Sequence, residues 1–186
     1  MRIVGGCHKG RGLAAPPGRG TRPTADRARE ALFNILAHAS FTDFSLADAL
    51  VLDAFAGSGA VGLEALSRGA AKAFFFDTDT VALAITRKNV NILGEEARTE
   101  IRRADATRPP LAGTACDLIF LDPPYGKGLI ERSLEVLLAK GWISEQSLIV
   151  GETAKSEELS IPPGFVLLEE RPSGAANFIF LARSAG

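Results

Sequence analysis

The sequence has few cysteines, few aromatic residues and no long apolar run. Its two cysteines, Cys7 and Cys116, stand far apart and provide no disulfide framework, so a reducing cytoplasm is the expected compartment. No apolar stretch approaches the roughly 18 residues that a membrane-spanning helix needs, and the first residues lack the apolar core of a secretory signal. His8 and His38 have no evident partner, and no His/Cys cluster has the spacing of metal ligands. We therefore expect a cytoplasmic protein with neither a membrane segment nor a metal site.

The net charge of −1 is also small, but the charges are unevenly distributed. Residues 1–30 carry seven lysines and arginines and two acidic residues, a net charge of +5, which leaves −6 for the rest of the chain. A basic segment on an acidic body favours contact with a polyanion. The alternative is a solvated, loosely ordered N-terminus.

The chain divides into a basic N-terminal arm, residues 1–20, and one compact unit, residues 21–186. In the arm, residues 2–4 and 11–13 flank a glycine-rich turn, a pattern that predicts a small hairpin. The compact unit begins with a helix expected over residues 25–37, where apolar residues recur at helical spacing.

From residue 50 onward, short apolar segments alternate with helical patterns. The predicted strands are 50–53, 73–76, 99–103, 117–121 and 147–150, and the predicted helices are one ending before Gly69, then 80–93 and 129–140. Such alternation produces right-handed βαβ units and an open parallel sheet, which is an α/β, Rossmann-like fold. Two last strands, 166–169 and 178–182, follow each other without a helix, so a C-terminal hairpin adds one antiparallel strand.

A glycine-rich loop follows the first strand of this sheet. The spacing of Gly57, Gly59 and Gly62 matches G-x-G-x-x-G, which allows a tight strand-to-helix turn and the close approach of a ligand. Asp77 stands 20 residues after Gly57, at the end of the next strand, where it can accept hydrogen bonds from both hydroxyls of a ribose. The pattern predicts a nucleoside-containing cofactor, and a nicotinamide dehydrogenase is one alternative.

Asp53 favours a different cofactor, because it places a carboxylate where the pyrophosphate of a dinucleotide would lie. S-adenosylmethionine has no phosphate and carries an ammonium and a sulfonium, which a carboxylate attracts. Asp53 could instead only cap the loop, and Asp105, after the third strand, could meet the adenine amine or be solvated. The predicted cofactor contacts are Asp53, Phe55, Gly57, Ser58, Gly59, Asp77 and Asp105.

The segment Asp122-Pro123-Pro124-Tyr125 follows the fourth strand, at the sheet edge where open α/β folds bind ligands. An amine on a base is a poor nucleophile because its lone pair is delocalised into the ring. The Asp122 carboxylate and the Pro123 carbonyl can accept both amine N–H bonds, and the paired prolines stiffen that arrangement. Tyr125 offers a face on which a base swung out of its helix could stack. The segment could be only a proline-rich turn, but its position predicts that Asp122, Pro123, Pro124 and Tyr125 are catalytic.

These residues carry a resemblance. Asp122 to Tyr125 is similar to the Asn/Asp-Pro-Pro-Tyr/Phe motif of amino-methyltransferases. Residues 2–11, 21–34 and 53–68 resemble the bacterial RsmD family, which methylates N2 of guanine 966 in 16S ribosomal RNA, and Arg-Pro-Thr-x-Asp-Arg at 22–27 is the most specific part. One departure is residues 171–174, which read Arg-Pro-Ser-Gly where the family often has Arg-x-Tyr-Gly.

The resemblance implies an S-adenosylmethionine-dependent methyltransferase with a seven-stranded sheet. It implies 16S rRNA, in the small ribosomal subunit or an assembly intermediate, as the partner. It also implies that the basic N-terminal arm binds RNA. The RNA-binding residues that we expect are Lys9 and Arg11 in the arm, and Arg22 and Arg27 just after it. Related motifs act on DNA adenine and on protein glutamine, so those amines stay open as targets. A non-catalytic RNA-binding or assembly protein is a further alternative.

Overall fold

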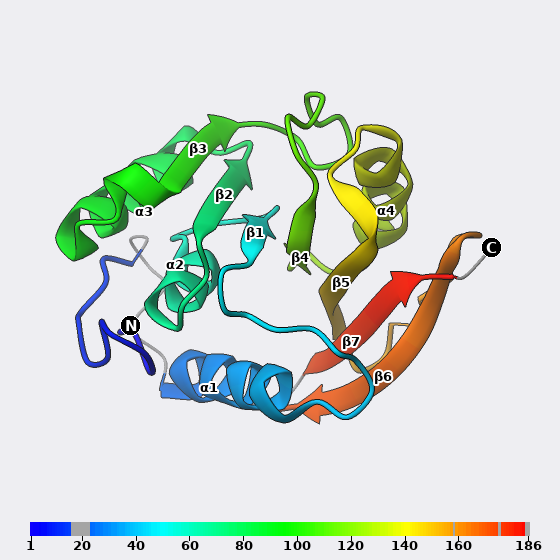
Figure 1. Ribbon diagram of the computed structural model, residues 1–186, viewed down its shortest axis with the longest axis horizontal. Coiled ribbons are helices and arrows are strands. Elements are labelled where there is room, and N and C mark those ends of the chain that lie inside the picture. The colour runs from blue at the N-terminus through cyan, green and yellow to red at the C-terminus, as the bar shows by residue number, and fades with distance from the viewer. Residues whose placement is uncertain (16–22, 158, 175, 185–186) are drawn as a thin grey trace.

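The computed structural model describes residues 1–15, 23–157, 159–174 and 176–184. Its strands are β1 (Leu50–Asp53), β2 (Lys72–Asp77), β3 (Thr99–Arg103), β4 (Cys116–Leu121), β5 (Ile143–Ala154), β6 (Phe165–Ser173) and β7 (Ala176–Arg183). Within the described residues these seven strands form one sheet in the order β3-β2-β1-β4-β5-β7-β6 (Figure 1). The strands from β3 to β5 are parallel to their neighbours, whereas β7 runs antiparallel to both β5 and β6. The predicted Rossmann-like sheet with a terminal antiparallel hairpin is therefore confirmed.

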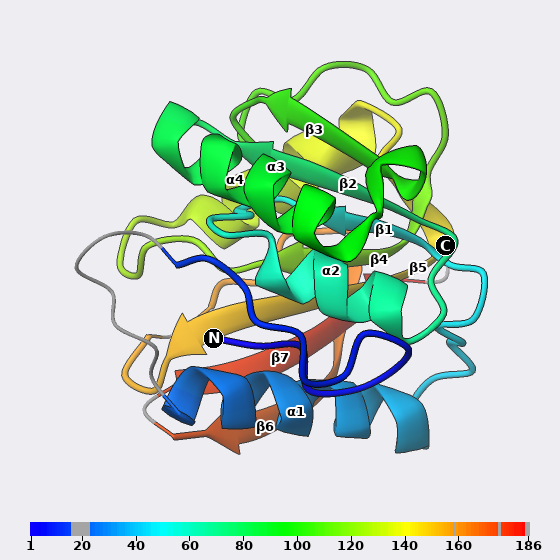
Figure 2. The same cartoon turned by 90° about the vertical axis from the view of Figure 1, so that its left-hand side faces the viewer.

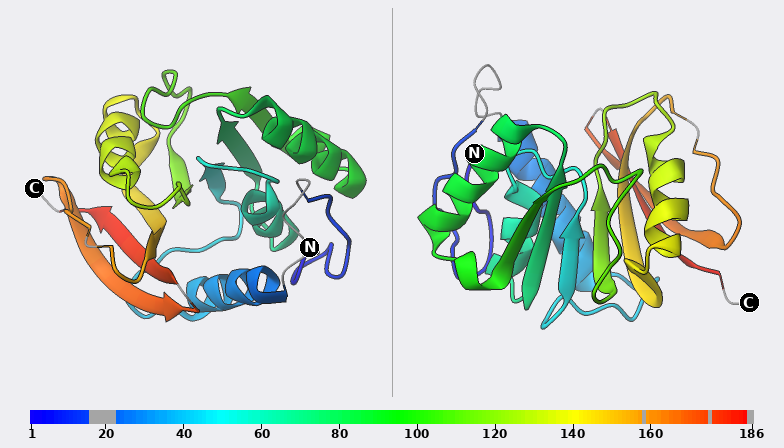
Figure 3. Two further views of the ribbon diagram at one scale, coloured as in Figure 1. Left: turned by 180° about the vertical axis from the view of Figure 1, so that it is seen from behind. Right: turned by 90° about the horizontal axis from the view of Figure 1, so that it is seen from above.

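Helices cover both faces of the sheet. They are α1 (Pro23–His38), α2 (Ala60–Ser67), α3 (Thr80–Leu93) and α4 (Leu129–Ala139), and a 3₁₀ turn, η1 (Glu96–Arg98), precedes β3. Figure 2 shows α1, α2 and α3 in front of the sheet, and the two views of Figure 3 show α4 on the opposite face. Helices on both faces bury the central strands completely, which explains their nearly continuous apolar sequences.

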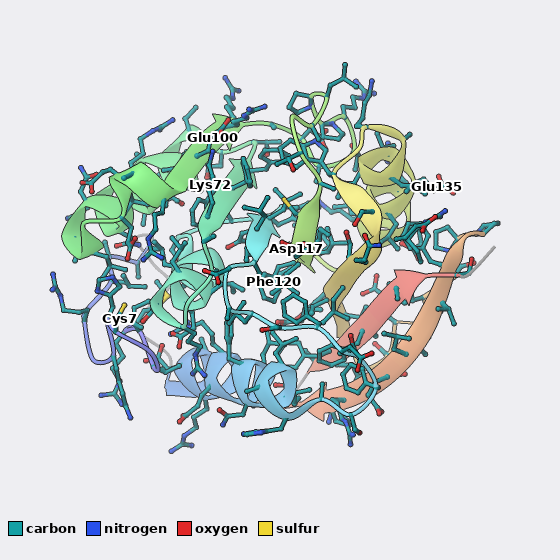
Figure 4. The ribbon with its side chains drawn as sticks, in the orientation of Figure 1. Cys7, Lys72, Glu100, Asp117, Phe120 and Glu135 are labelled. Atoms are coloured by element: carbon teal, nitrogen blue, oxygen red, sulfur yellow. The ribbon has the colours of Figure 1, made fainter. Side chains whose placement is uncertain are left out.

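Each face has its own apolar core. On the side of α1 to α3, the ring of Phe120 on β4 points toward α1 (Figure 4) and lies 5.8 Å from the ring of Phe33, centroid to centroid. On the side of α4, Trp142 is fully buried and meets the rings of Phe74 and Phe76 edge-on, at 5.4 and 4.9 Å. Its indole N–H donates to the Pro110 carbonyl at 2.8 Å, so this buried ring has no unmet donor. Together the two cores hold the central strands, and thus the site at their ends, in fixed positions.

Residues 1–15 pack against the helical layer. Ile3 is completely buried, Leu13 nearly so, and the Cys7 N–H donates to the Ser67 carbonyl at the end of α2. Gly6 has φ of +74°, and a Cβ at this position would overlap that same carbonyl, so the turn requires glycine. The alternative of a solvated, loosely ordered N-terminus is therefore wrong for these residues. The predicted hairpin is reduced to an antiparallel bridge between Arg2 and Gly12.

Some boundaries differ from the predicted ones. β5 spans 12 residues rather than the predicted four, and β6 continues to Ser173 rather than ending at Glu169. The helix bounds agree within two residues, and α3 ends at Gly94, whose φ of +73° is the left-handed conformation of a glycine cap. Among the described residues, no helix has the length and apolar character to cross a membrane.

Candidate active site

Four aspartates meet at one edge of the sheet. Asp53 and Asp77 end β1 and β2, while Asp105 and Asp122 follow β3 and β4. These four strands are neighbours and parallel, so their carboxyl ends lie along one edge, as the sequence predicted. Asp117, at the other end of β4 (Figure 4), instead accepts a hydrogen bond from the Leu50 N–H at 2.7 Å. The carboxyl edge is thus the candidate site.

The glycine loop is tied to the first two aspartates by backbone hydrogen bonds. The Gly57 N–H donates to Asp77 Oδ2 at 2.8 Å, and the Gly62 N–H donates to Asp53 Oδ2 at 3.1 Å. A Cβ on Gly62 would overlap the ring of Phe75 on β2, so the third glycine of the motif permits close packing of α2 on the sheet. Asp53 therefore does cap the loop through the Gly62 N–H, and it does so from the carboxyl end of β1.

Polar side chains on α3 hold the outer side of this loop. The Thr86 hydroxyl donates to the Gly57 carbonyl at 3.0 Å, and the Asn89 amide donates to the Ser58 carbonyl at 2.9 Å. Both side chains are completely buried. Sequence reasoning missed them, although two polar residues three positions apart on an apolar helix face were a usable signal. Thr86 and Asn89 thus fix the loop conformation from the side of α3, and a ligand would approach the loop from the opposite side.

Asp53 is the most perturbed acid at this edge. Its side chain is only 4% exposed. Burial raises the pKa of the Asp53 carboxyl to about 7, the Gly62 N–H counteracts part of that rise, and the nearby charge of Asp77 adds to it. A positive ligand group at the mouth of β1 would relieve this unfavourable charge, whereas a pyrophosphate would increase it.

Three other predicted cofactor residues, Asp105, Phe55 and Ser58, have described surroundings. Burial opposes ionisation of Asp105, but hydrogen bonds from the Thr107 hydroxyl and N–H, at 2.7 and 2.8 Å, hold the pKa of its carboxyl below the ordinary value. Asp105 is therefore a charged acceptor. Phe55 is half-buried against the α4-side core, and the Ser58 hydroxyl points to the Met1 sulfur at 3.6 Å. Carboxylates supported by backbone N–H groups suit a ligand rich in hydroxyl, amine and cationic groups, which is the chemistry of S-adenosylmethionine.

The Asp122 to Tyr125 segment presents its polar groups to solvent beside the glycine loop. Asp122 and Pro124 are exposed and Pro123 is buried, so the second residue anchors the turn. Tyr125 is 46% exposed, and its hydroxyl donates to Glu152 Oε1 on β5 at 2.7 Å. Burial and then this acidic partner raise the pKa of the Tyr125 hydroxyl above its usual range, so it stays protonated.

Two glutamates of this region were missed by sequence reasoning. Besides Glu152, Glu157 accepts the Gly126 N–H at 2.9 Å and the Ala154 N–H at 3.4 Å. The predicted strand ended at Val150, which concealed that Glu152 lies on β5 and that Glu157 lies in the turn just after it. The carboxylates of Glu152 and Glu157 make the surroundings of Tyr125 acidic.

The predicted RNA-binding residues do not form one cluster of free charges. Lys9 and Arg27 are exposed, and within the described residues Arg27 forms neither a hydrogen bond nor an ion pair. Arg11 is exposed but donates to the Ile92 carbonyl near the end of α3. Arg22 lies outside the described residues.

A buried ion-pair network joins the N-terminal segment to α1 and α2. Glu64 is completely buried, and its carboxylate accepts the Val4 N–H at 2.8 Å and lies 2.7 Å from Arg68 Nε and 3.5 Å from Arg29 Nε. Arg29 also contacts Asp26 at 2.9 Å. Arg29, which the sequence analysis counted only as part of the basic charge of residues 1–30, is therefore structural, as is Arg68.

His8 also has a partner, contrary to expectation. Its Nε2 lies 2.6 Å from Glu95 Oε1, and Cys7, on the outer N-terminal turn (Figure 4), completes a trio whose ligand atoms lie within 4.8 Å of one another. The Glu95 carboxylate is already held by Arg98 through hydrogen bonds of 2.6 and 2.8 Å. Because that guanidinium opposes a second cation, the group is better described as an ion-pair network than as a metal centre.

Comparison with known proteins connects this geometry to a family. The family model described as "Conserved hypothetical protein 95" matches residues 1–182. The chain is 36% identical over 186 residues to Ribosomal RNA small subunit methyltransferase D of Escherichia coli strain K12, covering 100% of this chain and 91% of that protein. It is 34% identical over 182 residues to the protein of the same name from Haemophilus influenzae, covering 96% and 91%. The solved structure of the Escherichia coli protein yhhF is similar with a TM-score of 0.83 and 33% identity, covering 100% of this chain and 99% of that one.

These similarities extend over the glycine loop, the Asp122 to Tyr125 segment and the terminal hairpin alike. The chain therefore belongs to the ribosomal RNA small subunit methyltransferase D family and is an S-adenosylmethionine-dependent methyltransferase with a Rossmann-like fold.

Proposed function

We propose that the protein transfers a methyl group to the exocyclic N2 amine of a guanine in 16S ribosomal RNA, by resemblance guanine 966. The substrate would be the small ribosomal subunit or an assembly intermediate. The observation that carries the proposal is the Asp122 to Tyr125 segment, an exposed carboxylate and aromatic ring at the end of β4, beside the glycine loop. The curated relatives act, by their names, on small-subunit ribosomal RNA.

In this proposal, Asp122 and the Pro123 carbonyl accept the two N–H bonds of the target amine. These two hydrogen bonds turn the nitrogen lone pair out of conjugation and toward the methyl group. They therefore stabilise the transition state, in which the amine is pyramidal, more than the bound substrate. The bound cofactor supplies an electrophilic methyl group on a sulfonium. The exposed face of Tyr125 stacks on the extruded base, and its hydroxyl is held by Glu152 at 2.7 Å, which fixes the ring.

The cofactor would be held by the three aspartates that precede Asp122 along the edge. We assign the ribose hydroxyls to Asp77, the adenine amine to Asp105, and the attraction of the cationic methionine end to Asp53. Asp77 holds the Gly57 N–H with Oδ2 and the Asp79 N–H with Oδ1, and each carboxylate oxygen has a second lone pair for a ribose hydroxyl. The other proposed contacts, all in the loop between them, are Phe55, Gly57, Ser58 and Gly59.

RNA would be engaged first by the basic residues of the N-terminal region. Lys9 and Arg27 are exposed and suited to phosphates, whereas Arg11 would have to exchange its bond to the Ile92 carbonyl for an RNA contact. Arg22 is proposed from the sequence alone. Phosphate contacts of this kind supply affinity and orientation, and the base itself is read at the catalytic segment.

The experiment that tests the proposed function is methyl transfer from labelled cofactor to four acceptors: bare 16S rRNA, small subunits, duplex DNA and bulk protein. We expect N2-methylguanosine in rRNA, identified by mass spectrometry of the nucleosides and mapped to one nucleotide. Labelled N6-methyladenine in DNA or labelled glutamine in protein, with unlabelled rRNA, would overturn the proposal in favour of another amine. Cofactor binding without transfer to any acceptor would favour an assembly protein.

A further inference from the structure

Glu152 places a second carboxylate beside the catalytic segment. In the sheet, Leu121 on β4 is in register with Gly151 on β5, so Asp122 and Glu152 are the next residues on two adjacent parallel strands. Glu152 is half-buried, and β7 flanks it on the other side through its pairing with Phe178. Its backbone is therefore held in the sheet by β7, one residue beyond the last pair with β4, and a side chain that must hold a defined geometry needs such a fixed backbone.

Only one oxygen of this carboxylate has a partner in the described part of the chain. Oε1 accepts the Tyr125 hydroxyl at 2.7 Å, whereas Oε2 accepts no hydrogen bond from a described residue, and Glu152 forms no ion pair there. The side chains that act electrostatically on Tyr125 are all acidic: Glu152, Asp122 and Glu157. A half-buried carboxylate among other acids has a strong need for a hydrogen-bond donor.

A guanine base supplies such a donor at this position. Along its Watson–Crick edge, guanine presents the N1–H next to the N2 amine, so both are donors. Adenine and cytosine carry their exocyclic amines next to a ring nitrogen that is an acceptor. A carboxylate beside the amine site therefore attracts guanine and repels the other two amine-bearing bases.

We propose that Glu152 is a specificity-determining residue, whose Oε2 accepts the N1–H of the guanine held by Asp122 and stacked on Tyr125. The inference rests on the proposed function and deepens it, because it names the group that chooses the base. The bond from the Tyr125 hydroxyl orients the carboxylate, so one side chain both fixes the stacking ring and reads the edge of the base. A site built around such a bond rejects an analogue that lacks the donor far more strongly than an apolar pocket could.

The test uses the full chain with Glu152→Gln and, as a matched control, Glu157→Gln. Glutamine at 152 still accepts the Tyr125 hydroxyl but presents an amide N–H in place of the second oxygen. Glu157 has the same chemistry nearby, but its two oxygens accept the backbone N–H groups of Gly126 and Ala154 and leave no oxygen to read a base, so its variant should keep the wild-type preference for guanosine whatever its activity. The acceptors are small subunits reconstituted with 16S rRNA that carries either guanosine or 2-aminopurine at the methylated nucleotide. 2-Aminopurine keeps the N2 amine but has an acceptor at N1.

Wild type should methylate guanosine and discriminate against 2-aminopurine by at least about 100-fold in kcat/KM. For Glu152→Gln, kcat/KM on guanosine should fall by about 100-fold. The preference for guanosine over 2-aminopurine should disappear or reverse, because the glutamine amide can donate to N1 of 2-aminopurine. An unchanged preference in Glu152→Gln, whatever its activity, would overturn the inference and leave the proposed function intact. A wild-type enzyme that methylates no guanine N2 in the small subunit would instead overturn the proposed function, and the inference with it.

Discussion

Replacement of Asp53 by asparagine should stabilise the protein without ligand while weakening cofactor binding. Burial raises the pKa of this carboxyl from 3.8 to about 7. The folded state therefore holds the proton more tightly than the unfolded chain between these values, and stability falls as the pH rises through this window. Three pKa units at about 1.4 kcal/mol each give a destabilisation of about 4 kcal/mol at most above pH 7.

Asparagine removes the charge and still accepts the Gly62 N–H, which Asp53 binds at 3.1 Å. Its amide N–H groups need partners that the aspartate did not, at a cost of about 1–3 kcal/mol. We therefore expect Asp53→Asn to raise the free energy of unfolding by about 1–3 kcal/mol at pH 8, with the advantage disappearing toward pH 4. Urea unfolding across this pH range measures the difference between the two proteins.

The same charge should control cofactor affinity. Binding of a cationic ligand lowers the pKa of Asp53, so affinity of the wild type for S-adenosylmethionine should increase from about pH 5 to pH 7. Asp53→Asn should bind more weakly and lose this dependence in calorimetry. Two results would refute the reasoning: a variant that is less stable than wild type at pH 8, or one that keeps the pH dependence of binding.

Three further predictions concern the network, the cofactor edge and the arm. Glu64→Gln should lower the free energy of unfolding by about 1–3 kcal/mol in urea, because it takes the charge partner from Arg68 and leaves buried Arg29 with Asp26 alone, and a loss below about 0.5 kcal/mol would contradict this. Asp77→Ala should weaken S-adenosylmethionine binding by about 1–3 kcal/mol in calorimetry, and unchanged affinity would remove Asp77 from the site. Loss of Lys9 and Arg11 together should flatten the log–log salt dependence of small-subunit binding by up to about two units, with cofactor affinity unchanged. An identical slope would exclude the arm as a phosphate contact.

The fold could be predicted from the sequence to the extent that burial leaves a pattern. Central strands such as β4 have apolar runs, here residues 118–121, because helices cover both faces, and that pattern located them. β5 was underestimated at its start because residues 144–146 are polar and lie at a register shift between β4 and β5, and at its end because residues 152–154, which pair with β7, are not continuously apolar. A hydrophobic pattern indicates which residues are buried. It does not indicate how far a strand continues where its residues are polar, so the ends of β5 could not be predicted.

The site was predictable where a topological rule links sequence to space. Parallel strands bring their carboxyl ends together, so Asp53, Asp77 and Asp122 could be grouped before any coordinates. Glu152 could not be grouped with them, because its contact with Tyr125 joins residues 27 apart through a strand whose end was misplaced. The partners of Glu64 were hidden for a related reason, since one of them lies 60 residues away in the N-terminal segment.

In the proposed mechanism, Asp122 acts on the amine during methyl transfer rather than on cofactor binding. The direct measurement is single-turnover methyl transfer to small subunits by wild type and by Asp122→Ala, with the cofactor Kd determined in parallel. For Asp122→Ala we expect a rate at least about 100-fold lower, with less than about a threefold change in Kd. A near-wild-type rate in Asp122→Ala, or a rate loss explained entirely by weaker cofactor binding, would contradict it.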